Sequence, residues 1–171
     1  TFFLVGTNLS MPVQTGGRLN LYFWDANAFD NEGAIQVTIS VEACPPSFPI
    51  CAGWTGERPI RVDAREHSVQ AGQGGQAGQP ADTGLDVRAG QLLVISADNV
   101  ARWKAGAAPV WGSNANGMNH LVTYKGFTFR VGALVGSIDD GSTFFLVGTS
   151  LSMRVQTGGR LNLYFWDANA F

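Results

Sequence analysis

One 29-residue stretch occurs twice in this chain, and this repetition constrains the fold more than any other feature of the sequence. "TFFLVGTNLSMPVQTGGRLNLYFWDANAF" occupies residues 1–29, and "TFFLVGTSLSMRVQTGGRLNLYFWDANAF" occupies residues 143–171. The copies differ at two positions, where Asn8 corresponds to Ser150 and Pro12 corresponds to Arg154. A repeat that recurs after 142 residues, from residue 1 to residue 143, has a period close to the usual size of a domain. It predicts a tandem array of like units, and a recent duplication within the gene is the alternative.

The segment that follows the repeat suggests where the units begin and end. The first copy continues into "DNEGAIQVTISVE" at residues 30–42, whereas the second copy stops at Phe171. We therefore expect residues 1–42 to be the C-terminal half of one repeat and residues 58–171 to be the next repeat, truncated before its last strand. Residues 43–57, which contain three prolines and two cysteines, are expected to be a hinge between them.

The charge content and the distribution of apolar residues argue against two classes of partner, nucleic acid and membrane. Only 14% of the residues are charged, the net charge is −2, and no basic stripe is present, so nucleic acid is an unsuitable partner. No run of eighteen or more apolar residues occurs, so we expect no membrane span.

The two cysteines point to an oxidising location. Cys44 and Cys51 flank a proline-rich loop, "CPPSFPIC", and their spacing does not fit a redox or zinc pair. A disulfide that closes this loop would contribute roughly 2–3 kcal/mol and would imply an extracellular or cell-surface protein. Two reduced surface thiols are the alternative.

Strand patterns dominate the chain. In "GAIQVTISVE" the residues Ile35, Val37, Ile39 and Val41 alternate with polar ones, which is typical of a half-buried β-strand. Short strands separated by glycine turns predict an all-β protein with a jelly-roll-like β-sandwich. Further strands are expected at residues 18–25, 59–64, 90–97, 127–138 and 143–148, and a flexible Gln/Gly-rich loop at residues 65–82.

Catalytic signatures are not found in the sequence. No Gly-x-Ser-x-Gly, His-Glu-x-x-His or cysteine–histidine pattern occurs. Asp139 and Asp140 are adjacent acids, but with Gly141 they fit a tight turn better than a glycosidase cleft. We therefore expect the protein not to be an enzyme.

Several segments together resemble one lectin family. The order of four segments resembles that in PA-IL-type bacterial lectins, provided that the fourth is read as the continuation of the second copy of the repeat. The segments are "ADTGLDVRAGQLLVISA", "ARWKAGAAPVWG", "FRVGALVGSIDDG" and "GRLNLYFWDANAFDNEGAIQVTIS". The resemblance implies a jelly-roll-like sandwich that binds galactose in a calcium-dependent manner.

The loop "WDANAFDNEGA" contains the candidate metal ligands. Asp25, Asn27, Asp30 and Asn31 are hard oxygen donors, and calcium takes six to eight oxygens. The resemblance places Asp25, Asp30 and Asn31 at the positions of family ligands. The alternative is a metal-free turn, because Asp, Asn and Gly are also favoured in turns. In the second copy Asp167 lacks the Asp-Asn pair, so a site there would need the equivalent residues of a neighbour.

A sugar subsite is implied at two further residues. The family uses a histidine and a glutamine; His120 offers the first, but no glutamine follows at the family spacing. Trp111 could stack on a sugar, as could Trp103 and Trp166, although core tryptophans are commoner. A backbone carbonyl near residues 105–106 would be a further calcium ligand in the family. An ordinary loop histidine is the alternative for His120.

These observations lead to two functional hypotheses. The first is a repeat unit of an extracellular fibre or adhesin, whose partners are copies of itself joined head to tail or by shared strands. The second is a calcium-dependent galactose-type lectin, in which an array of linked sites would raise avidity for glycans.

Overall fold

The computed structural model describes residues 17–25, 32–42, 56–69, 79–99, 103–105, 112–139 and 143–167, with the backbone alone for residues 17–25. Throughout these residues the secondary structure consists of strands and turns, so the expected all-β class is confirmed. The described segments contain no helix that is long and apolar enough to cross a membrane.

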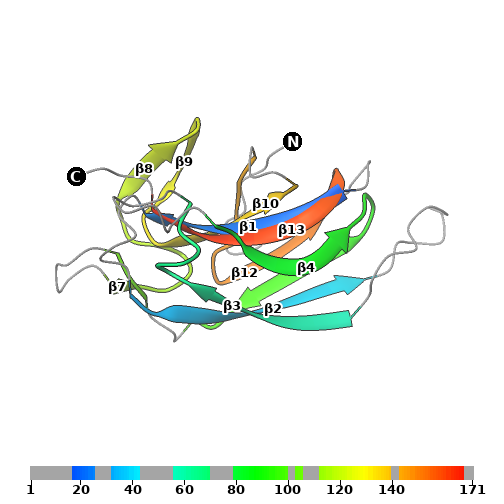
Figure 1. The fold of residues 1–171 in the computed structure, drawn as a ribbon, viewed down its shortest axis with the longest axis horizontal. Helices are drawn as coiled ribbons and strands as arrows, with labels where there is room; N and C mark the ends of the chain where they lie inside the picture. Colours follow the sequence, from blue (N-terminus) through cyan, green and yellow to red (C-terminus); the bar gives the residue numbers. More distant parts are fainter. Residues whose placement is uncertain are drawn as a thin grey trace.

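Two main sheets face each other, as expected for a β-sandwich (Figure 1). The first has five strands in the order β11 (Phe145–Leu146), β10 (Ala133–Ile138), β1 (Gly17–Asp25), β13 (Gly158–Trp166) and β4 (Ala81–Val87). The second has four strands in the order β12 (Ser150–Arg154), β5 (Leu92–Ala97), β2 (Ala34–Glu42) and β3 (Gly56–Asp63). Two small ribbons complete the fold, β6 (Trp103–Lys104) with β7 (Gly112–Ser113) and β8 (Leu121–Tyr124) with β9 (Phe127–Arg130).

Strand β2 shows why the alternating sequence forms a central strand. Its four alternating apolar side chains are all buried, and the strand pairs antiparallel with β3 on one side and β5 on the other. Burial of each such side chain contributes about 1.5–3 kcal/mol relative to exposure. The pattern predicted for residues 34–42 is thus confirmed, and it fixes the register, because a slip by one residue would expose all four side chains.

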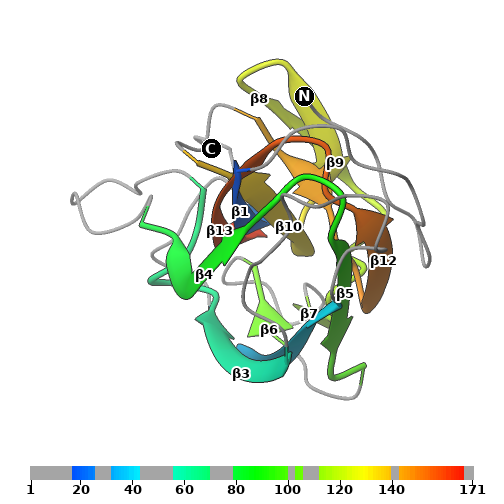
Figure 2. The ribbon, with the colours of Figure 1, turned by 90° about the vertical axis from the view of Figure 1, so that its right-hand side faces the viewer.

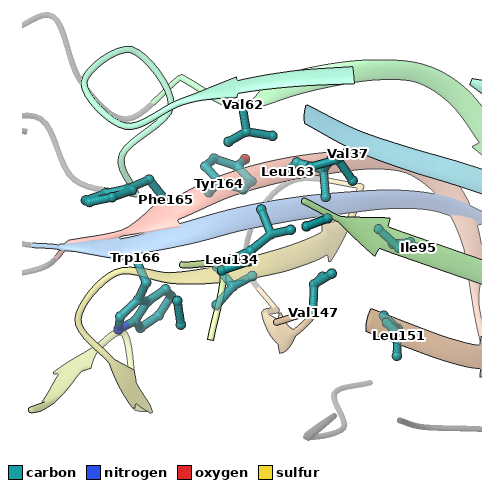
Figure 3. Packing of buried hydrophobic residues seen from close by; sticks show 14 of the residues in the cluster. Val37, Val62, Ile95, Leu134, Val147, Leu151, Leu163, Tyr164, Phe165 and Trp166 are labelled. Carbon is teal, nitrogen blue, oxygen red and sulfur yellow. The ribbon is translucent and has the colours of Figure 1, made fainter. Parts of the chain in front are cut away.

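The core lies between the two sheets (Figure 3). Val37, Val62 and Ile95 come from one sheet, and Leu134 and Leu163 come from the other; all are fully buried. Seen along the sandwich, the strands of both sheets surround this interior (Figure 2).

Strand β13 is buried on both of its faces. Phe144 contacts Tyr164 and Trp166, with ring centroids 5.8 and 5.2 Å away, so these two side chains share a face. Phe165, between them in sequence, contacts the ring of Trp103 at 5.0 Å. The β8–β9 hairpin covers the face that carries Trp166, whose ring lies 4.8 Å from that of Phe129.

The expected strand over residues 127–138 is in fact two strands. It breaks at Val131 and Gly132, and Gly132 has a φ of 80° that favours glycine. β8 and β9 form a hairpin with a two-residue turn, Lys125 and Gly126, and both turn residues have positive φ. β11 covers only two residues of the strand expected at 143–148, and β3 starts at Gly56, inside the segment expected to be a hinge.

The duplicated segments lie next to each other. β1 and β13 pair in parallel, and the central pairs are Asn20 with Asn162, Leu21 with Leu163 and Phe23 with Phe165. Each of these residues therefore lies beside its own repeat, 142 positions further along the chain. Strand β10 pairs antiparallel with both copies.

Candidate metal centre at the end of the duplicated strands

Asp167 stands directly after β13, and its carboxylate is the most unusual polar group in the described part of the chain. The residue is fully buried, and neither Oδ1 nor Oδ2 has a hydrogen-bond partner among the described residues. An ionised carboxylate accepts hydrogen bonds but cannot donate them, and burying it unpaired costs several kcal/mol. A bound cation is one of the few arrangements that offsets this cost.

The backbone that carries Asp167 is held from two sides. On one side, residues 67–69 run parallel to it: the Phe165 amide donates to the His67 carbonyl at 2.7 Å, and the Val69 amide donates to the Phe165 carbonyl at 2.9 Å. The Ser68 hydroxyl donates to the Asp167 carbonyl at 3.4 Å. On the other side, the Gly132 amide donates to the Trp166 carbonyl at 3.2 Å. The carboxylate is therefore attached to a fixed backbone, as a metal ligand requires.

The two described tryptophans near this end of the sheet are core residues. Trp103 and Trp166 are both fully buried. The Trp103 indole donates to the Gly132 carbonyl at 3.0 Å, and the Trp166 indole donates to the Val122 carbonyl at 3.3 Å. Of the two uses considered for these side chains, the structural one is confirmed, because neither ring offers a face to a sugar.

Two predicted ligand positions adjoin one backbone contact. Glu32 and Lys104 form an isolated antiparallel bridge, with amide-to-carbonyl distances of 3.1 and 2.8 Å. Glu32 directly follows Asn31, the last predicted ligand of the loop, and Lys104 directly precedes residues 105–106, where the lectin resemblance implies a carbonyl ligand. The ion pair between the same side chains, 3.1 Å long, is exposed and contributes little.

Most of the predicted site residues lie outside the described segments. This applies to Asn27, Asp30 and Asn31 of the metal loop, to Trp111, and to the predicted disulfide between Cys44 and Cys51. For Asp25 the backbone is described: it pairs with Trp166, so the acidic residues of both copies come to the same end of the sheet. The described residues alone do not bring three acidic, histidine or cysteine side chains together.

His120 lies in the loop before β8 and is exposed. Its carbonyl accepts a hydrogen bond from the Val131 amide at 2.8 Å, which ties this loop to the turn between β9 and β10. Its place in a sugar subsite stays a prediction.

His67, to which the sequence assigns no role, has a defined structural position. Residues 65–69 were expected to begin a flexible loop, but they form an ordered turn after β3. The Asp63 amide donates to His67 Nδ1 at 2.8 Å, and the His67 amide donates to the Asp63 carbonyl at 3.0 Å. Burial lowers the pKa of His67, against the raising effect of Glu66 and Asp63.

Comparison of the chain with protein-family models, with curated proteins and with solved structures found no match. The lectin resemblance therefore rests on the quoted segments and their order along the chain.

Proposed function

We propose that this chain is a repeat unit of an extracellular fibre or adhesin built from lectin-like β-sandwich domains, and that its partners are copies of itself. The observation that supports this proposal is the parallel pairing of the two copies of the duplicated segment, β1 and β13, which is in register at their central pairs. A strand with this sequence has its own duplicate as a neighbour in the sheet. The same pairing can occur between units that carry the same segment.

Strand pairing suits assembly between identical units for two reasons. Main-chain hydrogen bonds provide affinity, while alternating side chains provide specificity and register. The low charge of the chain, with a net value of −2, also keeps electrostatic repulsion between copies small.

The test is direct observation of the native material. Negative-stain microscopy and light scattering over a range of protein concentrations should show elongated particles whose length grows with concentration. Compact monomers at every concentration would overturn the assembly role.

A second function, calcium-dependent binding of a galactose-type carbohydrate, is favoured by a different observation. Asp167 supplies a fixed, buried carboxylate without a hydrogen-bond partner in the described residues. We propose that it binds calcium together with the loop that leads into β2, whose donors are Asn27, Asp30 and Asn31. The site is then composite: one acidic residue comes from the second copy and the remaining donors follow the first copy.

Glycan binding measured with and without a chelator tests this second function. We expect binding to galactose-terminated glycans in calcium and loss of that binding in chelator. Equal signals under both conditions would contradict calcium-dependent recognition. His120→Ala and Trp111→Ala should weaken glycan binding while leaving calcium binding intact, since both side chains are assigned to the sugar and not to the metal.

A further inference from the structure

Strand β10 pairs with both copies of the duplicated segment in the same register. Asn20 of β1 pairs with Ser137, and so does Asn162 of β13, the equivalent residue of the second copy. The other pairs obey the same relation: Leu21 pairs with Gly136 and Phe165 with Leu134, and a shift of 142 residues converts one set of pairs into the other. Both copies therefore pair with the same stretch of β10, and equivalent residues of the two copies have the same partner.

The two strands are chemically equal at this position. Residues 17–25 and 159–167 have the same sequence, "GRLNLYFWD". Since the two strands have the same sequence and pair with β10 in the same register, the sequence gives neither copy an intrinsic advantage there. A strand has two edges, and β11 pairs with β10 at Val135 and Gly136 as well. One copy of the duplicated strand is therefore enough to pair with the remaining edge of β10.

We infer that β1 is an exchangeable strand: it leaves its own sheet and takes the position beside β10 in a second copy of this chain. This inference rests on the proposed self-assembling function and specifies the joint. The duplication lowers the free-energy cost of the exchange. In most proteins, donating a strand leaves an open edge with unpaired backbone groups. Here β13 also pairs with β10 at Leu134, Ser137 and Ile138, so it covers this edge whenever no β1 strand, from the same or another copy, lies there.

The connection between β1 and β2 is long enough for such a transfer. Eight residues, 26–33, separate Asp25 from Ala34. Fully extended, eight residues span at most about 29 Å, several times the spacing of about 4.8 Å between neighbouring strands. β2 can therefore stay paired with β3 and β5 in its own molecule while β1 enters the next one. Reciprocal exchange gives a closed dimer, and sequential exchange gives an open chain.

Cysteine cross-linking between separately labelled chains tests the exchange. Ser137 is fully buried, so a cysteine at this position meets another only if a strand lies directly beside it. Directly opposite residues of antiparallel strands have Cα atoms about 4.5–5.5 Å apart, within the range of a disulfide. One chain carries Asn20→Cys and the other carries Ser137→Cys, both in a Cys44→Ser, Cys51→Ser background. We expect the mixture to form interchain disulfides under mild oxidation.

The second copy supplies the matched control. A mixture of Asn162→Cys chains with Ser137→Cys chains should give few interchain disulfides, because β13 remains in its own molecule. Equal cross-linking of both mixtures would reflect random collision and would overturn the exchange.

A proline provides an independent readout. Proline cannot donate to a strand ladder and is excluded from central strands. Leu21→Pro should abolish the higher-order species while leaving a folded monomer, since β13 can still pair with β10 without β1. Leu163→Pro, the same change in the second copy, should unfold the protein or lower its melting temperature strongly.

The outcomes separate this inference from the proposed function. Fibres that form without interchain cross-links, and that persist in Leu21→Pro, would overturn strand exchange and leave the fibre role intact. Cross-linked closed dimers without fibres would uphold the exchange and overturn the fibre role. Monomers without cross-links would overturn both.

Discussion

At the scale of single residues, the aspartate at the end of the second copy has an unusual environment. Asp25 and Asp167 have the same immediate neighbours in sequence, "FWDANAF", but only Asp25 is followed by Asp30 and Asn31, so the sequence favoured the aspartate of the first copy as a metal ligand. The tertiary structure buries Asp167 completely, without a partner for its carboxylate in the described part of the chain. This burial has no signature within the repeat, whose residues 17–25 and 159–167 are identical.

Replacing Asp167 by asparagine should change the free energy of unfolding in opposite directions with and without calcium. Without calcium, Asp167→Asn should be at least as stable as the parent, because it removes an uncompensated buried charge. With calcium at about one hundred times its dissociation constant, the parent should gain about 2.7 kcal/mol and the variant should gain none. Thermal unfolding with and without calcium measures both effects.

Two matched variants make this test specific. Asp82→Asn, at an exposed side chain on β4, should keep the full calcium response. Asp25→Asn should keep most of it, since the composite site uses the aspartate of the second copy. A parent protein that gains nothing from calcium would contradict the metal centre.

His67 should make stability depend on pH. Its pKa is lowered in the fold below the ordinary value of 6.5 by burial, and its Nδ1 accepts a hydrogen bond, which requires the neutral ring. Between the lowered pKa and pH 6.5 the unfolded chain binds more protons than the folded one, so the free energy of unfolding falls as the pH falls through this window. Above pH 6.5 the full contribution is present.

Denaturant unfolding at several pH values checks this expectation. His67→Asn keeps an acceptor close to the position of Nδ1 and should have a flatter profile below pH 6.5 than the parent. His120→Asn, at the exposed histidine, should follow the parent. Parallel profiles for the parent and His67→Asn would contradict the assignment.

At the scale of elements, the sequence predicted strands such as β2 and β5 but missed others, among them β8 and β12, and it did not predict the break between β9 and β10. β2 could be predicted because β-branched residues alternate with polar ones over its whole length. The break between β9 and β10 could not, because the backbone of Gly132 is used by distant groups: its amide bonds to Trp166 and its carbonyl accepts the Trp103 indole. Such contacts have no local signature in "FRVGALV".

The covered outer face of β13 is a second feature that sequence patterns miss. Alternation assigns one face of a strand to the core and the other to solvent, yet Tyr164 and Trp166 are as buried as Leu163 and Phe165. The β8–β9 hairpin covers this face, and the turn at Lys125 and Gly126 that forms it was not predicted. Of the candidate site, the resemblance predicted ligands at the end of the first copy, which stay predictions, whereas the buried carboxylate of Asp167 was not predicted.

Removing one aromatic ring from the hairpin should uncover β13. Phe129→Ala deletes a buried ring packed edge-on against Trp166 and should cost about 3–5 kcal/mol in the free energy of unfolding. Thr128→Ala, at the exposed neighbour in β9, should change stability by no more than about 0.5 kcal/mol. Urea unfolding measures both. A loss below about 1 kcal/mol for Phe129→Ala would mean that the hairpin does not stabilise this face.

At the scale of the whole molecule, the described strands on both sides of the expected hinge belong to one sandwich. β2 precedes residues 43–57, yet it pairs with β3 and β5, which follow them. Ile39 lies opposite Ile95 in this pairing, and both side chains are fully buried. The two parts of the chain therefore share one core and should unfold together, in a single transition.

Paired core substitutions on the two sides of the hinge should shift that one transition. Ile39→Ala and Ile95→Ala should each cost about 2–5 kcal/mol, because each removes buried methylene groups and leaves a cavity in the same layer. The double variant should lose less than the sum of the two, since neighbouring cavities merge and the residues contact common partners. Gln36→Ala and Ser96→Ala, exposed positions on the same two strands, are the controls. Urea unfolding followed by tryptophan fluorescence and by circular dichroism should give coincident curves for every variant. Two separate transitions, with Ile39→Ala moving only one of them, would instead mean that the strands before and after the hinge fold as independent units.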